Sequence, residues 1–226
     1  MASSSELGVV LVVGGCGYLG SNLVKALQAE STCTAIHGLI PSRTSLAQAN
    51  VDGIRNLLKA TRETENTRAF IYTGSHSALE QMPVIKQTEE TAKLYSEFSK
   101  DANPYAKSKA IADAEVQAAD TPSALTTAVI RIPELYGEND DNCVGTLLDT
   151  IKKGQHNACE AHILAAKRIL EGRLNGGQAF FISDGVSLPY FDFARKLYAG
   201  AGHPVPPDQI KVMPLWLVVS IAQLGE

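Results

Sequence analysis

The chain has 226 residues, of which 45% are hydrophobic and 19% are charged, and its formal net charge is −4. This ordinary globular composition is sufficient for one core and a small second lobe, and the lack of a basic block argues against nucleic acid as a partner. The scattered cysteines show no metal-ligand spacing, so no metal is expected, and they favour a reducing, intracellular compartment; they are Cys16, Cys33, Cys143 and Cys159.

The first element predicted along the chain is a strand at residues 8–13, "GVVLVV", whose unbroken apolar run is typical of a strand covered on both faces. Glycines follow it in both the GxGxxG and the GxxGxxG forms, and a helical pattern continues over residues 21–30. A glycine turn lets an anion approach the main chain, and the N-terminus of the next helix attracts that anion. The order of strand, glycines and helix therefore predicts a dinucleotide site, while the lack of Gly-Lys-Ser/Thr argues against a nucleotide-triphosphate loop.

Strand and helix patterns alternate through the rest of the chain. The predicted strands cover residues 34–40, 68–75, 124–132 and 177–184, and the predicted helices cover 46–63, 103–120, 143–154, 158–172 and 187–202. Helix 103–120 begins with Asn103 and Pro104, a typical helix start. The alternation predicts the α/β fold class, with a doubly wound parallel sheet of Rossmann type and a small C-terminal lobe.

Tyr105 and Lys109 lie four residues apart in "PYAKSK" and therefore share one face of the predicted helix. A tyrosine hydroxyl has a pKa of about 10 in water, and a nearby ammonium stabilises the phenolate and makes it available for proton transfer. Ser75 ends the predicted strand 68–75, from where its hydroxyl can bond to the same substrate oxygen. Together with a dinucleotide turn, these three residues predict an enzyme.

Five segments, which occur in this order, resemble the extended short-chain dehydrogenase/reductases: "GGCGYLG", "NVDGIRNLL", "FIYTGS", "PYAKSKAIAD" and "VIRIPELYGEND". Within that family, "AIHGLIPS", the region from "FFISDG" to "GAGHP" and "PLWLVVSIAQLGE" are most similar to the 3β-hydroxysteroid dehydrogenase branch, which includes the sterol-4α-carboxylate 3-dehydrogenases. The resemblance implies a catalytic set in which Ser75 orients the substrate oxygen and Tyr105 moves the proton. Lys109 would support Tyr105 and bind the nicotinamide ribose.

The cofactor implied by the resemblance is NAD, with NADP as the alternative. The residues expected to bind it are Gly14, Gly17, Tyr18, Leu19, Gly20, His37, Tyr105, Lys109, Ile132 and Pro133. Packing or capping is an equally good explanation for His37. The same holds for Asn50, which stands where the family often has an asparagine of a proton relay.

The implied reaction is an NAD(P)-dependent oxidation of a secondary alcohol, or reduction of a ketone, at C3 of a sterol, steroid or triterpenoid. A substrate with a 4-carboxylate would also lose carbon dioxide from C4. Three alternatives stay open: a sugar-nucleotide epimerase, a dihydroflavonol-type carbonyl reductase, and a non-catalytic protein that senses dinucleotides.

The expected partners are a lipid-like small molecule and a second copy of the chain. In relatives a homodimer pairs helix 50–60 with the Tyr105 helix, and five apolar positions suit either that interface or the core: Ile54, Leu57, Leu58, Ile111 and Val116. The start "MASSSELG" lacks a signal-peptide pattern, so a cytoplasmic location is expected. Residues 212–224 are apolar but too few to span a bilayer, which takes about 20; they predict a buried helix or a peripheral contact, for example with the endoplasmic reticulum membrane.

Only 16 residues separate Gly20 from His37, where the family has a further strand, helix and strand of about 40 residues. The predicted dinucleotide domain, residues 1–137, therefore lacks that unit between about residues 30 and 35, and residues 138–226 mix the substrate lobe with the last Rossmann elements. Either segments are left out of the printed chain or the chain is truly shortened. The first explanation is favoured, because a shortened chain would lose central strands and expose the core of its sheet.

Overall fold

The computed structural model describes residues 6–39, 46–64, 66–81, 87–135, 153–183, 185–186, 188–200, 202–209 and 214. Strands and helices alternate within these ranges, as predicted. The elements are β1 (Gly8–Val13), α1 (Tyr18–Gln28), β2 (Cys33–Leu39), α2 (Leu46–Glu63), β3 (Ala69–Ser75), α3 (Pro104–Ala118), β4 (Thr126–Ile132), α4 (Lys153–Leu170), β5 (Gln178–Phe181) and α5 (Tyr190–Gly200). Cys143, the predicted helix as far as residue 152, and residues 212–224 apart from Pro214 lie outside the described residues.

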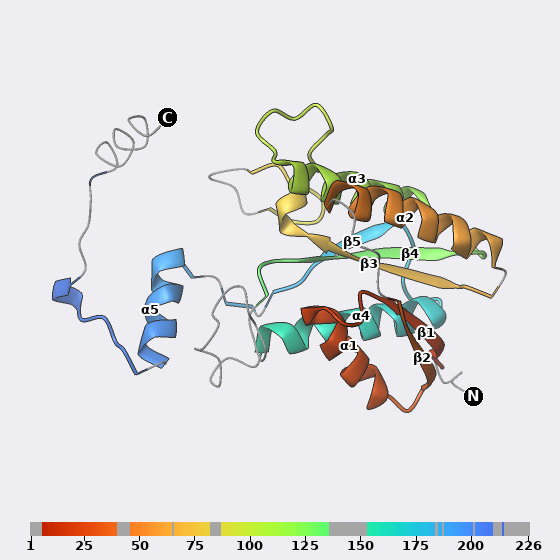
Figure 1. Cartoon of the computed structure of the whole chain (residues 1–226), viewed down its shortest axis with the longest axis horizontal. Helices are drawn as coiled ribbons and strands as arrows, with labels where there is room; N and C mark the ends of the chain where they lie inside the picture. The colour runs from red at the N-terminus through yellow and green to blue at the C-terminus, as the bar shows by residue number, and fades with distance from the viewer. Residues whose placement is uncertain are drawn as a thin grey trace.

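All strand pairs are parallel, as predicted, but the described strands form two sheets rather than one. β1 pairs with β2, and the second sheet has the order β3-β4-β5. α2 and α3 cover one face of the larger sheet and α4 covers the other (Figure 1). The unit of β1, α1 and β2 packs against α4, where Leu23 and Leu27 of α1 share a core with Ile163 and Leu170.

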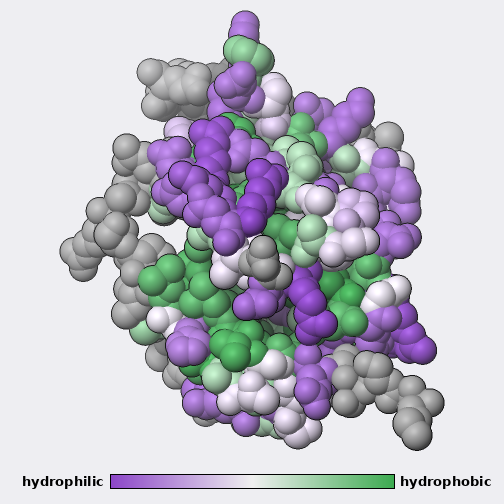
Figure 2. Space-filling model, turned by 90° about the vertical axis from the view of Figure 1, so that its right-hand side faces the viewer, coloured by the Kyte–Doolittle hydropathy of each residue, from purple (hydrophilic) through white to green (hydrophobic). Residues whose placement is uncertain are grey.

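The prediction that strand 8–13 is covered on both faces is wrong. Val9, Leu11 and Val13 are 67%, 57% and 40% exposed, whereas Val12 is 5% exposed. α1 packs on the face that carries Val12, and no described helix covers the opposite face. Hydrophobic surface is accordingly visible on the side of the molecule where β1 and β2 lie (Figure 2).

The expectation that segments are left out between Gly20 and His37 stays a prediction; in the structure a tight turn joins α1 to β2. The N–H of Glu30 donates to the carbonyl of Leu27, and the N–H of Cys33 donates to the carbonyl of Glu30. This tight turn makes β1, α1 and β2 a complete βαβ unit. In this unit the face of β1 that carries Val9, Leu11 and Val13 stays exposed.

The principal core lies between the β3-β4-β5 sheet and its two covering helices. Ile54 and Leu58 of α2 and Val116 of α3 are buried there, packed with Tyr72 and Val129 of the sheet. Leu57 is partly buried against the same core, so four of the five positions considered for a dimer interface pack inside this chain. No helix in the described part of the chain is long and apolar enough to cross a bilayer.

Candidate active site

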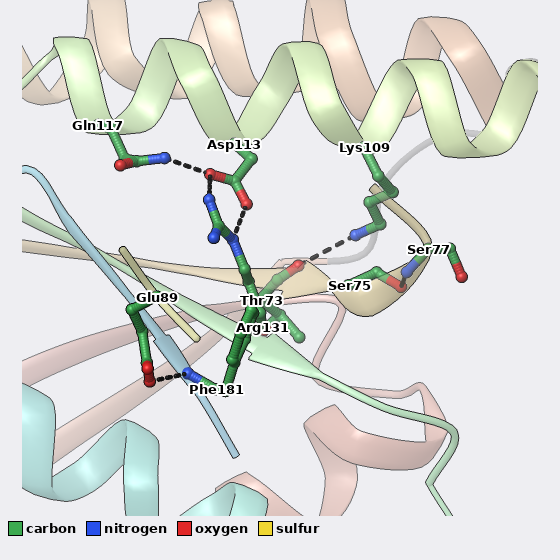
Figure 3. A network of polar contacts seen from close by, with 9 residues as sticks. All are labelled: Thr73, Ser75, Ser77, Glu89, Lys109, Asp113, Gln117, Arg131 and Phe181. Carbon is green, nitrogen blue, oxygen red and sulfur yellow. Dashed lines mark hydrogen bonds and ion pairs between the residues drawn. The ribbon is translucent and has the colours of Figure 1, made fainter. Parts of the chain in front are cut away.

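Ser75 lies at the carboxyl end of β3, in register with Ile132 at the end of β4. It also begins a short 3₁₀ turn, His76–Ala78, in which Ser75 Oγ accepts a hydrogen bond of 3.2 Å from the N–H of Ser77. A hydroxyl that accepts from the backbone keeps its own O–H for another acceptor. Ser75 therefore offers a hydrogen-bond donor at the end of the sheet (Figure 3).

α3 begins beside this edge in the way that the sequence predicts. Asn103 Oδ1 accepts a hydrogen bond of 2.8 Å from the N–H of Ala106, and Pro104 is the first helical residue. This cap places Tyr105 in the first turn, where its side chain is 38% exposed. Lys109 follows one turn later and points toward β3 (Figure 3).

The ammonium of Lys109 lies in a largely buried position above β3. Its Nζ donates a hydrogen bond of 3.0 Å to the carbonyl of Thr73 and lies 4.8 Å from the centre of the Tyr72 ring. Burial lowers the pKa of Lys109 to about 8, and the nearby carboxylate of Asp113 opposes that shift. Because this pKa is still above neutral pH, the side chain is mainly positive at neutral pH.

Two tyrosines, Tyr72 of β3 and Tyr105 of α3, belong to the elements that form this site, and their environments differ. Tyr72 is buried, and its hydroxyl has no hydrogen-bond partner among the described residues. Burial raises the pKa of Tyr72 well above its usual range, and Asp113 and Tyr105 add to the rise. Tyr72 therefore stays neutral, and Tyr105 is the phenol that a substrate can reach.

A buried ion pair that sequence reasoning missed supports the site. Asp113 of α3 is fully buried and accepts two hydrogen bonds from Arg131 of β4, at 2.8 and 3.0 Å (Figure 3). A β-carbon on Gly74 would lie 2.7 Å from Val129 Cγ1 and 3.4 Å from Asp113 Oδ2, so the pair packs directly on bare backbone. A single arginine inside an apolar strand was the available signal, because a buried charge needs a partner.

The glycine turn after β1 needs glycine at two of its positions. Gly14 has a φ of +81°, and its N–H donates to the carbonyl of Leu39 at 2.8 Å, which ties the turn to the end of β2. A β-carbon on Gly20 would lie 2.1 Å from the carbonyl oxygen of Gly14 and 2.9 Å from Gly15 Cα. Only glycine therefore allows α1 to pack this closely on the turn.

The same turn fits the pyrophosphate of a dinucleotide. The N-cap of α1 is Gly17, which brings no side chain to the helix N-terminus, and the first turn that follows, beginning Tyr18 and Leu19, has no acidic residue. Amides at a helix N-terminus that no side chain caps are a suitable anion site. α1 begins on the same side of the molecule as the carboxyl end of β3 (Figure 1).

The remaining predicted site residues are placed unevenly. Ile132 is half-buried beside Ser75, and Pro133 follows it at the surface. His37 lies within β2 opposite Leu11, and no described contact joins it to Ser75, Tyr105 or Lys109. The structure brings Ile132 and Pro133 to the edge that carries Ser75, whereas His37 belongs to the other sheet.

Asn50 connects α2 to α3 through Ser108. Its Nδ2 donates to Ser108 Oγ at 3.0 Å, and Ser108 Oγ donates to the carbonyl of Tyr105 at 2.8 Å. These bonds hold α2 against α3 on the face where Ser108 is buried.

Known proteins resemble this chain in sequence. The 3-beta hydroxysteroid dehydrogenase/isomerase family matches it over residues 31–214. The sterol-4-alpha-carboxylate 3-dehydrogenase, decarboxylating, of Gibberella zeae is 37% identical over 216 residues, which cover 85% of this chain and 70% of that protein. The corresponding protein of Schizosaccharomyces pombe is 33% identical over 198 residues, which cover 80% of this chain and 56% of that protein.

Solved structures resemble the fold at lower identity. The UDP-glucose 4-epimerase of Thermotoga maritima, solved with UDP-glucose, has a TM-score of 0.66 at 15% identity and covers 88% of this chain and 84% of its own. The dTDP-glucose 4,6-dehydratase of Bacillus anthracis, solved with NAD, has a TM-score of 0.64 at 16% identity and covers 91% and 84%. These likenesses confirm the predicted Rossmann-type α/β fold.

Proposed function

Because the chain belongs to the 3-beta hydroxysteroid dehydrogenase/isomerase family, we propose that it is an NAD(P)-dependent oxidoreductase that interconverts a secondary alcohol and a ketone. The observation that carries the proposal is the placement of Lys109, partly buried near the end of β3, one turn after the exposed Tyr105 and near Ser75. This is an arrangement in which an ammonium supports a phenol that exchanges a proton with a substrate.

Each of the three side chains has a distinct task in the oxidation. Ser75 donates its free O–H to the substrate oxygen and holds it at the edge of the sheet. Tyr105, as phenolate, accepts the proton of the substrate hydroxyl. Lys109 stabilises the phenolate by its positive charge, and the reverse reduction uses the same three groups.

The glycine turn and the ends of two strands would hold the cofactor. When bound, a nicotinamide dinucleotide supplies the hydride acceptor or donor. Gly14, Gly17 and Gly20 leave the main chain open to the pyrophosphate, and Tyr18 and Leu19 supply helix N-terminal amides. Lys109, Ile132 and Pro133 would contact the nicotinamide end, with His37 as a more distant candidate.

We propose a 3β-hydroxysterol as the substrate class, with a carboxylate at C4 as the preferred form, because the relatives from Gibberella zeae and Schizosaccharomyces pombe carry that activity in their names. Oxidation at C3 places a ketone β to the carboxylate. The bond from C4 to the carboxyl carbon then breaks, carbon dioxide leaves, and the electron pair passes into the enolate of the C3 ketone. The chain spans 70% and 56% of the length of these two proteins. The substrate of the whole protein is therefore proposed rather than taken from the relatives.

The test is a spectrophotometric assay of the full chain with NAD or NADP and matched 3β-hydroxysterols with and without the 4-carboxylate. We expect reduced cofactor to form, and release of carbon dioxide only from the carboxylated sterols. Cofactor binding without turnover of any sterol, other alcohol or nucleotide sugar would contradict the enzyme and favour a dinucleotide sensor.

Three further properties of the whole protein stay predictions: a homodimer, a cytoplasmic location, and a peripheral contact with the endoplasmic reticulum membrane through residues 212–224. The outer faces of α2 and α3 are joined by an ion pair between Arg55 and Glu115 at 2.6 Å, which gives a dimer built there a polar surface. Light scattering of the purified protein and flotation with liposomes test the first and the third property. Cell fractionation tests the second.

A further inference from the structure

His162 of α4 is a buried titratable residue that the proposed mechanism does not use. It lies on the opposite face of the β3-β4-β5 sheet from Lys109 and is 6% exposed. Both ring nitrogens have partners: Nδ1 lies 2.7 Å from the carbonyl oxygen of Ala158, and Nε2 lies 2.9 Å from Thr73 Oγ1. The second contact connects α4 to the strand that ends in Ser75.

The partners of His162 determine its tautomer. A carbonyl oxygen only accepts hydrogen bonds, so the proton is assigned to Nδ1. Burial lowers the pKa of His162, so the ring is neutral at neutral pH. Its Nε2 therefore accepts from the hydroxyl of Thr73, and this bond fixes the Thr73 side chain on the α4 side of the sheet.

The carbonyl of Thr73 faces the open edge of β3. The carbonyl of Arg68 accepts from the N–H of Thr126 in β4, and successive carbonyls of a strand point to alternate sides. The carbonyl of Thr73, five residues later, therefore points away from β4, toward an edge that pairs with no strand in the described ranges. Lys109 Nζ donates a hydrogen bond of 3.0 Å to this carbonyl oxygen.

We infer that His162 is a positioning residue for Lys109 and acts through Thr73. The hydroxyl of Thr73 is hydrogen-bonded to His162 of α4, and its main-chain carbonyl accepts a hydrogen bond from Lys109 of α3. Thr73 therefore connects the helices on the two faces of the sheet. The consequence for catalysis rests on the proposed function, whereas the position of the ammonium is measurable without any substrate.

Other charged and titratable groups of the same region must stay in place during a test. Asp113 and Tyr72 lie beside the ammonium, Tyr105 acts on Tyr72, and Arg131 pairs with Asp113. None of them is altered in the variants below, so a change in the titration of Lys109 reports on Thr73 and His162.

The first experiment measures the pKa of Lys109 by NMR in the ¹³C-labelled chain without cofactor or substrate. Thr73→Val removes the hydroxyl but keeps the shape and the carbonyl, and His162→Leu removes the ring acceptor. We expect both variants to shift the pKa of Lys109 by about half a unit or more. A fall indicates an ammonium that stays buried with a poorer acceptor, and a rise indicates release into solvent.

Three matched variants serve as controls. Thr73→Ser keeps a hydroxyl donor, His162→Gln keeps an acceptor near the position of Nε2, and Cys159→Ala alters a buried side chain one turn earlier on α4. We expect these three to titrate like the wild-type chain. An unchanged pKa of Lys109 in folded Thr73→Val and His162→Leu, or an equal shift in Cys159→Ala, would overturn the inference.

The second experiment follows the pH dependence of kcat with the sterol substrate. Deprotonation of Lys109 limits kcat at alkaline pH. The alkaline limb of the pH profile should therefore shift in Thr73→Val and His162→Leu by the same amount as the pKa measured by NMR. In His162→Gln it should lie at the wild-type position. No turnover by the wild-type chain contradicts the proposed function alone. Wild-type turnover with unmoved alkaline limbs contradicts the inference alone.

Discussion

At the level of single residues, the site contains charged side chains that are largely shielded from water. Lys109 is kept positive in a buried position by a carbonyl, an aromatic face and the carboxylate of Asp113. Asp113 in turn is neutralised by Arg131. Local sequence indicated the spacing of Tyr105 and Lys109, because that spacing is set within one helix, but not the contacts of Lys109 with Thr73 and Tyr72.

Burial of Lys109 should appear as a dependence of stability on pH. The folded chain releases the Lys109 proton near pH 8 and the unfolded chain near its ordinary value of 10.5. Between these values the unfolded state binds more protons, so stability due to this residue rises with pH. Urea unfolding should therefore show the wild type gaining stability relative to Lys109→Met as pH rises through this window. A constant difference between the two proteins would contradict the lowered pKa.

Replacing only one member of the ion pair between Asp113 and Arg131 should lower the free energy of unfolding substantially. Asp113→Ala leaves Arg131 buried without its partner, and such a loss typically destabilises by about 3–5 kcal/mol. Arg131→Met should cost a similar amount, and the double variant should cost clearly less than the sum of the two. Chemical unfolding of all three variants measures this coupling, and additive losses would show that the pair does not act as a unit.

At the scale of elements, α3 and the glycine turn were predictable because their signals are local. Asn103 caps α3 as its position before Pro104 indicates, and Gly14 takes the positive φ that a tight turn requires. The contacts between elements were not predictable in this way. Lys109 and Thr73 are 36 residues apart, and Thr73 and His162 are 89 residues apart, so no local pattern connects them.

The glycine turn should not tolerate a single added methyl group at Gly20. Gly20→Ala brings the new carbon against the backbone of Gly14 and Gly15, so α1 must move away from the turn. We expect the affinity for NAD or NADP, measured by calorimetry, to fall at least about tenfold. Gly53→Ala in α2 is the control, because nothing lies within 4 Å of its added carbon. Equal cofactor affinity in both variants would argue against a dinucleotide at this turn.

Because one face of β1 is exposed, substitutions on its two faces should differ in their effect on stability. Leu11 is 57% exposed and Val12 is 5% exposed, although the two are neighbours in one apolar run. Leu11→Thr should change the free energy of unfolding by no more than about 0.5 kcal/mol, whereas Val12→Ala should cost about 1–3 kcal/mol. Equal losses in thermal or chemical unfolding would show that both faces of β1 are covered.

At the scale of the whole molecule, the α/β architecture and the family follow from the sequence, while the division into two sheets does not. The run from Val9 to Val13 is as apolar as that of a fully covered strand, and composition alone cannot tell whether a covering helix is present. The exposure of Val9, Leu11 and Val13 is therefore seen only in the structure.

The proposed enzyme depends on Tyr105, which, supported by Lys109, exchanges the proton of a substrate alcohol. The most direct measurement compares kcat for a 3β-hydroxysterol and the Kd for the cofactor in the wild-type chain and in Tyr105→Phe. We predict a fall in kcat of at least about a hundredfold with cofactor affinity nearly unchanged, because the variant loses one hydroxyl in the first turn of α3 and leaves the glycine turn intact. Turnover by Tyr105→Phe at the wild-type rate would contradict this role of Tyr105.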